Sequence, residues 1–427
     1  MQWTRSLATG GATLALASLV LTGCAAPGTD SGAPAATDDG TFLKIDWLAN
    51  EKAGIDAVVA AFQEANPGVQ VVVTTADTAQ YQASIRTQLG TGTAADVFYV
   101  WPGDGNTAAI RQLDGGDFMT DLSDEAWVAK YPDFIRELVS IDDEAYIMAP
   151  LATAFAPVYN ASALATSGLE APTTWSEVIP FCEAAVASGK VAFALAGNNL
   201  YAGQAPYYAL VADLVYGTGT EFDQELLDGK TTFDSHEGYL EATEKYLEMI
   251  DAGCFQPNAT GTPYDESNRM VASGEALGQF LIGTRIAALQ AAAPDETFTI
   301  VPFHSDDDDA TNALTLSTQG GAAVYAKSPR QETAKKFVAF LADNISLYQS
   351  VMPGTIPTIT DGFEPKDANE QVLADALGDG SAVHYLNQMW PNARIESAMV
   401  NGIQGLLIGT MTPKQMLEGM QKEFDTK

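Results

Sequence analysis

The fold class is decided by one stretch, residues 41–73, which reads TFLKIDWLANEKAGIDAVVAAFQEANPGVQVVV. Its first part, residues 41–48, has the alternating and apolar content that is typical of a strand. Apolar residues then recur at the spacing of one helix face: Ile55, Val58, Val59 and Phe62. Asn66-Pro67-Gly68 ends that helix, and residues 69–73 return as a second strand. Strand, helix and strand in this order predict a βαβ unit, which implies a parallel sheet covered by helices.

The same alternation continues along the chain. Residues 96–101 (DVFYVW) indicate another buried strand, ended by a Pro-Gly-Asp-Gly loop. Residues 191–195 predict a later strand, and residues 331–343 predict a helix with one apolar face. Residues 320–325 form an apolar run with two glycines, which suits a close backbone approach or a hinge. We therefore expect an α/β protein whose ligand lies beyond the carboxyl ends of parallel strands.

Length and charge narrow the class of protein. The chain from Thr41 to Lys427 is longer than one hydrophobic core normally supports, so two lobes are expected. Lysine and arginine number 21 against 55 aspartate and glutamate residues, a formal net charge of −34. Phosphate binding needs a basic field, so nucleic acid is a very poor partner for this chain, and adsorption to anionic lipid headgroups is disfavoured.

The N-terminus predicts a secreted protein. Residues 1–23 carry one arginine, then a short apolar segment and small residues, which is the layout of a secretory signal peptide. Leu21-Thr22-Gly23-Cys24 resembles the lipobox of bacterial lipoproteins, in which the cysteine takes a diacylglycerol and becomes the mature N-terminus. Residues 24–40 have almost nothing to bury and are expected to form a disordered tether. The alternative is an incidental cysteine in an ordinary signal peptide. The lipobox interpretation places the protein outside the cytoplasm, anchored to the bacterial cell membrane by lipid alone.

Two cysteines remain beyond Cys24, and they are Cys182 and Cys254. An even pair in an oxidising compartment favours a disulfide, although two free buried thiols are the alternative. A bridge would close a loop of about 70 residues, which is worth about 4 kcal/mol in the chain-entropy model.

Several segments, in the same order along the chain, resemble one known family. They are residues 62–69 (FQEANPGV), 89–97 (LGTGTAADV), 171–175 (APTTW), 270–276 (MVASGEA) and 412–417 (TPKQML). The chain resembles family 1 of the bacterial extracellular solute-binding proteins, the carbohydrate-type group of ABC importers that includes maltose-binding protein. This resemblance covers essentially all of residues 41–426.

The resemblance implies a two-lobe clamshell, each lobe a mostly parallel sheet flanked by helices, with a ligand cleft between the lobes. The expected division is residues 41–152 with 285–320 for one lobe, 156–280 with 325–427 for the other, and crossings at 150–159, 279–285 and 320–325. It also implies that a monomer captures a mono- or oligosaccharide without a cofactor and delivers it to the transmembrane subunits of a permease.

Sugars present hydroxyl groups and flat apolar faces, so aromatic rings and fixed polar side chains at expected cleft positions are the candidate ligand contacts. After the first strand these are Trp47, Glu51 and Lys52, where the acid–lysine pair matches one that contacts sugar in the family. The alternative is a tryptophan in the core beside a solvated charge pair. After the strand at residues 96–101 the candidates are Trp101 and Asp104.

Further candidates lie in the second half of the expected cleft. They are Asn199, Tyr201, Tyr207, Gln319, Gly320 and Trp390. Tyr207 falls where the family places a stacking tyrosine, but a tyrosine-rich helix face is equally consistent with core packing. Gln319 and Gly320 offer amide and backbone donors near the expected hinge, and Trp390 precedes a proline in a late loop.

Arg285 departs from the family pattern. Gly283-Thr284-Arg285 stands where many relatives have a tryptophan whose ring lies under the sugar. A planar guanidinium pairs bidentately with a carboxylate or stacks weakly, so a cleft-facing Arg285 points to an acidic ligand or to fewer stacked rings. A structural ion pair is the alternative in so acidic a chain.

Catalytic and metal sites are not indicated. The three histidines, His236, His304 and His384, are widely separated, with no His-Glu-x-x-His run and no Gly-x-Ser-x-Gly elbow. We therefore expect a non-catalytic binding protein with no metal and no cofactor. Two other interpretations remain, a lipoprotein that senses its ligand for a membrane receptor and an extracytoplasmic glycoside-processing enzyme.

Overall fold

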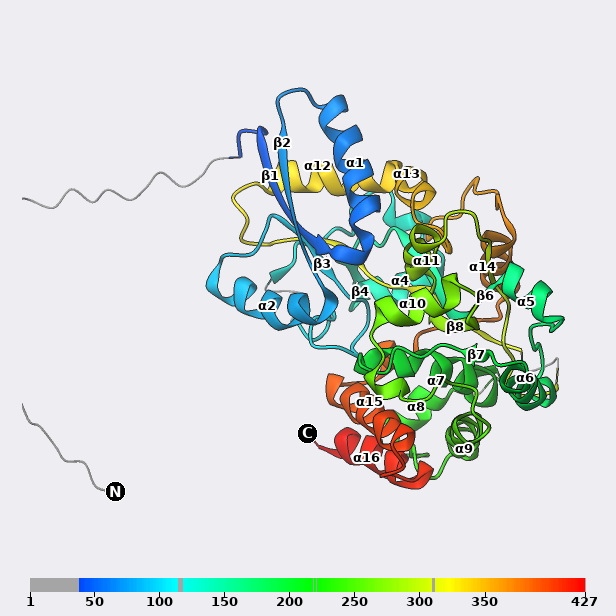
Figure 1. Cartoon of the computed structure of the whole chain (residues 1–427). Coiled ribbons are helices and arrows are strands. Elements are labelled where there is room, and N and C mark those ends of the chain that lie inside the picture. The colour runs from blue at the N-terminus through cyan, green and yellow to red at the C-terminus, as the bar shows by residue number, and fades with distance from the viewer. Residues whose placement is uncertain (1–37, 114–117, 218, 220, 309–311, 427) are drawn as a thin grey trace, which may run out of the picture. The chain divides into compact units, whose positions relative to one another are not determined.

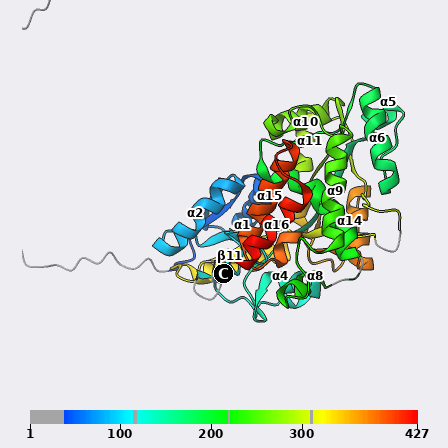
Figure 2. The same cartoon turned by 90° about the horizontal axis from the view of Figure 1, so that it is seen from below.

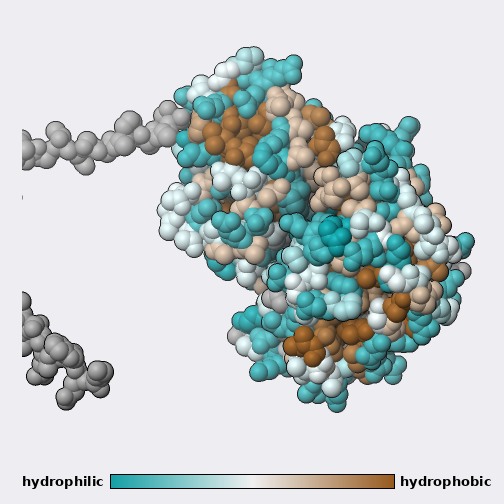
Figure 3. All heavy atoms as spheres, in the orientation of Figure 1, coloured by the Kyte–Doolittle hydropathy of each residue, from teal (hydrophilic) through white to brown (hydrophobic). Residues whose placement is uncertain are grey.

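The computed structural model describes residues 38–113, 118–217, 219, 221–308 and 312–426, which belong to one compact unit (Figure 1). The expected signal peptide, the lipid-modified Cys24 and nearly all of the tether lie outside the described residues. No helix in the described ranges has the length and apolar character that a membrane crossing requires. Hydrophilic residues are spread over the face in Figure 3, between residues of intermediate hydropathy and a few hydrophobic patches.

The first sheet contains the predicted βαβ unit. Its strands, in spatial order, are β11 (Gly321–Val324), β3 (Val97–Val100), β1 (Phe42–Leu48) and β2 (Gln70–Ala76). β1 pairs in parallel with β2 and β3, whereas β11 runs antiparallel to β3. Helix α1 (Lys52–Ala65) buries the predicted face of Ile55, Val58, Val59 and Phe62. The α/β prediction is confirmed.

The second sheet is built around β6 (Leu151–Asn160), in which every residue is buried. Its spatial order is β13 (Ala382–Val383), β10 (Leu314–Thr318), β6, β8 (Ala276–Ile282) and β7 (Val191–Phe193), and β9 (Phe298–Ile300) and β12 (Thr355–Pro357) also pair with β6. All four partners of β6 are antiparallel to it, so this sheet is mixed rather than mostly parallel.

Two apolar clusters cover the two faces of the second sheet. Phe155 and Tyr159 of β6 belong to one cluster, and Ala154 and Val158 belong to the other. This is the two-residue period of a strand buried on both faces. A third cluster fills the first sheet and its helices.

The remaining helices surround these sheets. Around the first sheet lie α2 (Thr78–Thr91), α4 (Asp133–Val139), α12 (Gln331–Asp343), α13 (Ile345–Ser350), η1 (Ala49–Glu51) and η2 (Val128–Lys130), with the small ladder β4 (Ser140–Ile141) and β5 (Glu144–Ala145). Around the second sheet lie α5 (Ala161–Ser167), α6 (Trp175–Ala187), α7 (Gln204–Val211), η4 (Ala212–Gly217), α8 (Phe222–Leu227), α9 (Glu237–Asp251), α10 (Tyr264–Ala272), α11 (Ile286–Ala292), α14 (Ala368–Asp379), α15 (Ala393–Leu407), α16 (Pro413–Asp425), η3 (Leu200–Gly203), η5 (Ala259–Gly261), η6 (Gly283–Arg285) and η7 (Leu386–Met389). Figure 2 shows α15 and α16 packed side by side. We call each sheet with its helices the first lobe and the second lobe.

The chain path between the lobes differs from the expected one. Residues 285–320 carry β9 and β10, which pair with β6, so they belong to the second lobe. Residues 279–285 are no crossing, because β8 lies inside the second sheet. The chain returns to the first lobe at β11, and α12 and α13 then pack on α1, where Phe62 and Phe337 meet at 5.2 Å between ring centroids. The last crossing follows α13, before β12 joins β6.

Gly320 and Gly321 make the crossing between β10 and β11 possible. Gly320 has φ +150°, and a Cβ there would lie 2.5 Å from the Val100 carbonyl oxygen. A Cβ on Gly321 would lie 2.0 Å from the Met148 carbonyl oxygen. Only glycine lets three backbones approach this closely, which is the close backbone approach that the two glycines of residues 320–325 predicted.

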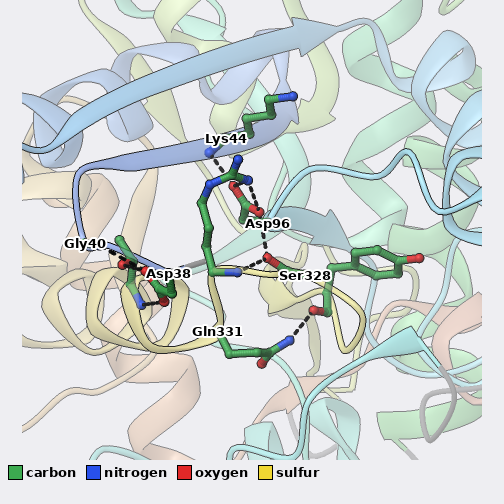
Figure 4. Close-up of polar contacts among 9 residues, drawn as sticks. Asp38, Gly40, Lys44, Asp96, Ser328 and Gln331 are labelled. Carbon is green, nitrogen blue, oxygen red and sulfur yellow. Dashed lines mark hydrogen bonds and ion pairs between the residues drawn. The ribbon is translucent and has the colours of Figure 1, made fainter. Parts of the chain in front are cut away.

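A buried carboxylate, Asp96, fastens the returning segment to the first sheet (Figure 4). It accepts hydrogen bonds from the backbone N–H of Lys44 at 2.8 Å and from the Ser328 hydroxyl at 2.6 Å. The Arg330 guanidinium pairs with the same carboxylate at 2.9 Å. Both carboxylate oxygens thus have partners, as a buried charge requires, and the turn that precedes α12 is held beside β1.

The predicted disulfide between Cys182 and Cys254 is present, which removes the alternative of two free thiols. Cys182 lies in α6 and Cys254 follows α9, with their Cα atoms 4.8 Å apart and both side chains fully buried. The bridge ties α6 to the segment that follows α9, far away in sequence, on one face of the second sheet.

Replacing both cysteines by serine (C182S with C254S) should lower the free energy of unfolding by about 2 to 5 kcal/mol, because the bridge restricts the unfolded chain over a separation of 72 residues. Urea denaturation without reductant measures the change. The single variant C182S is the control, and it should lose as much as the double variant. Additive losses from the two cysteines would show that packing of separate thiols, and not the bridge, carries the stability.

Candidate functional site

A cavity of about 550 Å³ lies between the two lobes. The first lobe supplies Asn50, Asp77, Thr78, Gln82, Trp101, Pro102 and Asn106. The second lobe supplies Phe155, Asn199, Tyr201, Gln204, Tyr264, Phe280, Arg285, Tyr385, Asn387, Gln388 and Glu396, and Gln319 lies on the crossing between the lobes. A volume of this size is typical of a small-molecule site.

The first-lobe wall follows the carboxyl ends of three parallel strands. Asn50 comes after β1, Asp77 directly after β2, and Trp101 directly after β3. Parallel strands end at the same edge of a sheet, so these side chains meet there although the sequence separates them widely. This is the edge that the strand pattern predicted.

Amide side chains in the second-lobe wall are held by hydrogen bonds. The Gln388 amide donates to the Thr318 carbonyl oxygen at 2.8 Å and accepts from the Ser317 hydroxyl at 2.7 Å. The Asn199 side chain accepts from the backbone N–H of Tyr201 at 3.0 Å. Such bonds fix polar groups before any ligand arrives, which lowers the entropic cost of binding.

Beside the cavity, the lobes contact each other through backbone atoms of residues 103–105 and 387–388. The N–H of Asp104 donates to the Gln388 carbonyl oxygen at 2.9 Å. A Cβ on Gly105 would lie 1.7 Å from the Asn387 carbonyl oxygen, and a Cβ on Gly103 would lie 2.1 Å from that of Gln388. The Pro-Gly-Asp-Gly loop therefore acts as a contact between lobes, a role that its sequence did not reveal.

Two ionisable groups in the cavity have unusual surroundings. Burial raises the pKa of Glu396 to about 8. A hydrogen bond from the Asn387 amide at 2.7 Å favours the charged form, but it does not offset the effect of burial. Its carboxyl group is therefore mostly protonated at pH 7. The Arg285 guanidinium lies over the Tyr264 ring, 4.0 Å from the centroid.

Five of the predicted contacts line the cavity. They are Trp101, Asn199, Tyr201, Arg285 and Gln319. Their direct contact with a ligand stays a prediction, but the structure brings all five to one cavity from the end of β3, from η3 and the residue before it, from η6 and from the segment after β10.

The three candidates after the first strand lie elsewhere. Trp47 is fully buried, and its indole N–H donates to the Tyr348 hydroxyl at 2.9 Å. This agrees with the alternative of a tryptophan in the core. Glu51 is 2% exposed and faces the same cluster. Lys52 is exposed and pairs with Asp56. The loop does reach the cavity, but Asn50 is the residue that lines it.

The other four candidates also lie outside the cavity lining. Asp104 pairs with Arg111 at 3.4 Å, and Gly320 lies at the crossing between the lobes. Tyr207 is fully buried, with its hydroxyl 3.0 Å from that of Thr243. Trp390 is fully buried against Phe233, although the loop before it supplies Asn387 and Gln388.

Sequence reasoning missed several lining residues. Tyr264, Phe280 and Tyr385 carry no pattern that separates them from core aromatics. Glu396 is the fourth residue of α15, directly after a late loop that was already a candidate, but only the fold turns it toward the cavity. Within the described ranges, no three His, Cys, Asp or Glu side chains gather closely enough to hold a metal ion.

Glu51 is an acid inside the core of the first lobe. It accepts hydrogen bonds from the hydroxyls of Tyr99 (2.9 Å) and Tyr348 (2.6 Å). Burial nevertheless raises its pKa from 4.5 to about 7, because two neutral donors do not offset the loss of water.

The raised pKa of Glu51 makes stability depend on pH. Between pH 4.5 and about 7 the unfolded chain releases this proton and the folded chain keeps it, so Glu51 should lower the free energy of unfolding by about 3 kcal/mol as pH rises through this range. E51Q should remove this contribution and flatten the slope without abolishing it, because burial also raises the pKa values of Asp223 and Glu396. Denaturation of both proteins across the range measures it, and E64Q, a change at an exposed glutamate of α1, should keep the wild-type slope. Parallel profiles for wild type and E51Q would contradict the assignment.

Comparison with known proteins agrees with this architecture. The family model described as bacterial extracellular solute-binding protein matches residues 47–345. No curated protein matches the sequence.

Solved structures share the two-lobe fold. A protein from work on xylan utilisation by Caldanaerobius polysaccharolyticus is 19% identical, with a TM-score of 0.76 over 90% of this chain and 99% of that one. A family 1 extracellular solute-binding protein from Bifidobacterium longum subsp. infantis is 20% identical, with a TM-score of 0.69 over 91% and 99%. A sugar transporter from Bacillus licheniformis, solved with stachyose, is 18% identical, with a TM-score of 0.71 over 90% and 98%.

Proposed function

The chain belongs to the bacterial extracellular solute-binding protein family, and we propose that it captures a carbohydrate in the cavity between its lobes. The observation that carries the proposal is the lining of that cavity, which contains both aromatic rings and amides held by hydrogen bonds. Rings bind the flat C–H faces of a sugar, and amides and carboxyls exchange hydrogen bonds with its hydroxyls. The stachyose bound to the relative from Bacillus licheniformis supports the same ligand class.

Capture without chemistry is the proposed mechanism. The lobes meet on one side of the cavity through Asp104 and Gln388, and they are linked by short crossings that can flex. A ligand that contacts both walls favours the closed arrangement by its differential affinity for that state. The closed form then presents both lobes to the transmembrane subunits of an ABC permease. We propose a monomer, since one chain supplies both walls.

Titration calorimetry of the full-length chain against a panel of mono- and oligosaccharides should give stoichiometric binding, and chromatography should recover the sugar unaltered. W101A should weaken the affinity by about 3- to 10-fold, because it removes one stacking ring. W127A removes a tryptophan that is 3% exposed in the first lobe and does not line the cavity. It should leave the affinity unchanged in protein that folds. A panel without binding, or with turnover of the sugar, would contradict the proposal.

Lipid anchoring at Cys24 is the second part of the proposed function. The lipobox precedes a polar segment long enough to hold the folded unit away from a membrane, and the family is extracellular. Acyl chains contribute about 0.8 kcal/mol per buried CH₂, so two or three of them hold a protein durably.

Expressed in a bacterial host, the chain should partition into the detergent phase of a Triton X-114 extract and incorporate labelled palmitate. C24A should move it to the aqueous phase without changing sugar affinity, because residue 24 lies far along the chain from the cavity walls. Equal partition of the two proteins would refute the anchor and leave the binding function standing.

A further inference from the structure

Arg285 differs from the other arginines of the described chain in having no protein acceptor. Arginines that pair with carboxylates are Arg111, Arg136, Arg269, Arg330 and Arg394. Arg86 donates to the Gln112 carbonyl oxygen at 2.8 Å. Among the described residues, no hydrogen bond or ion pair reaches the guanidinium of Arg285, although the chain has 55 acids for 21 bases.

The position of Arg285 makes the missing acceptor informative. The residue ends η6, which contacts η1 of the other lobe, and it lines the cavity together with Asn50 of η1. Its guanidinium carbon lies 4.0 Å from the centroid of the Tyr264 ring. Stacking holds the planar group in one orientation, so little rotamer freedom is left to lose when its N–H donors find a partner.

We propose, resting on the carbohydrate-binding function above, that the ligand is an acidic saccharide whose uronic carboxylate pairs with Arg285. A guanidinium fork matches the two oxygens of a carboxylate, and such charge-assisted pairs are the strongest hydrogen bonds in proteins. Arg285 is the one cationic side chain that lines the cavity among the described residues. One cation suits a singly charged carboxylate better than a phosphate, which carries close to two charges.

The other charges do not oppose this ligand at close range. Glu396 is mostly protonated at pH 7, so it offers a hydroxyl donor rather than a second negative charge. Asp77 is exposed at the rim, where water and salt screen it. The net charge of −34 is spread over a large surface, and with a Debye length of about 8 Å at physiological salt the exposed charges far from the cavity are largely screened.

Matched ligand pairs test the proposal by calorimetry on the full-length chain. The probes are glucuronic acid against glucose and glucuronamide, galacturonic acid against galactose, and cellobiouronic acid against cellobiose. At least one acid should bind about 10- to 100-fold more tightly than its neutral partners. Added salt should weaken the acid more than the neutral sugar.

Variants assign that preference to Arg285. R285Q should reduce the ratio of acid to neutral affinity to within about threefold, and R285K, which keeps the charge but not the fork, should give an intermediate ratio. R86Q removes the same charge from an exposed site outside the cavity lining and should keep the wild-type ratio. If R285Q does not fold, Y264L removes the stacking ring and keeps the charge, and it should also lower the ratio.

The outcomes separate the two proposals. Neutral sugars that bind as tightly as their acids, or a preference that survives in R285Q, would overturn the acidic ligand and leave carbohydrate binding intact. If no saccharide binds, the proposed function fails, and the inference about Arg285 fails with it.

Discussion

The structure depends on a two-residue connection, Gln319 and Gly320, between strands of different sheets. β10 is held by β6 in the second lobe and β11 by β3 in the first, so the chain must change sheets within this distance. Backbone atoms of Val100 and Met148 approach the connection so closely that a side chain at residue 320 or 321 has no room. Because Gln319 also lines the cavity, the geometry that joins the lobes places one of the amides of the cavity wall. A change in the lobe angle would therefore be felt directly at the site.

A second contact between the lobes also links their packing to the cavity. His384 of the second lobe pairs with Glu137 and stacks on Phe134 of the first, with ring centroids 3.9 Å apart. The Ser317 hydroxyl lies 3.4 Å from the same imidazole and donates to the Gln388 side chain that lines the cavity. The Ser317 hydroxyl thus contacts both an imidazole between the lobes and an amide of the cavity wall. Such a network is satisfied in one arrangement of the lobes, which gives that arrangement a defined geometry.

Buried acids take different roles in this acidic chain. Asp96 is compensated by an arginine and by backbone and hydroxyl donors, and it fastens the returning segment. Glu51 and Glu396 have only neutral donors, so their burial is expressed as raised pKa values. One of them stands in the core and the other at the cavity. Arg285 is the converse, a cation that lines the cavity and has no carboxylate partner among the described residues.

The sequence by itself determined the βαβ unit, the two-lobe class, the glycine-rich crossing and the disulfide, because each rests on local periodicity, on backbone freedom or on counting cysteines. It also indicated the loops around the cavity, since these follow directly from strand ends. It did not decide which side chain of a loop lines the cavity: Asn50 rather than Trp47, and Asn387 rather than Trp390. Nor did it order β9 and β10, whose pairing with β6 keeps residues 285–320 in the second lobe. Those choices were made by tertiary packing, because a large aromatic ring is equally suited to a core and to a sugar, and only the neighbours it meets in space decide between them.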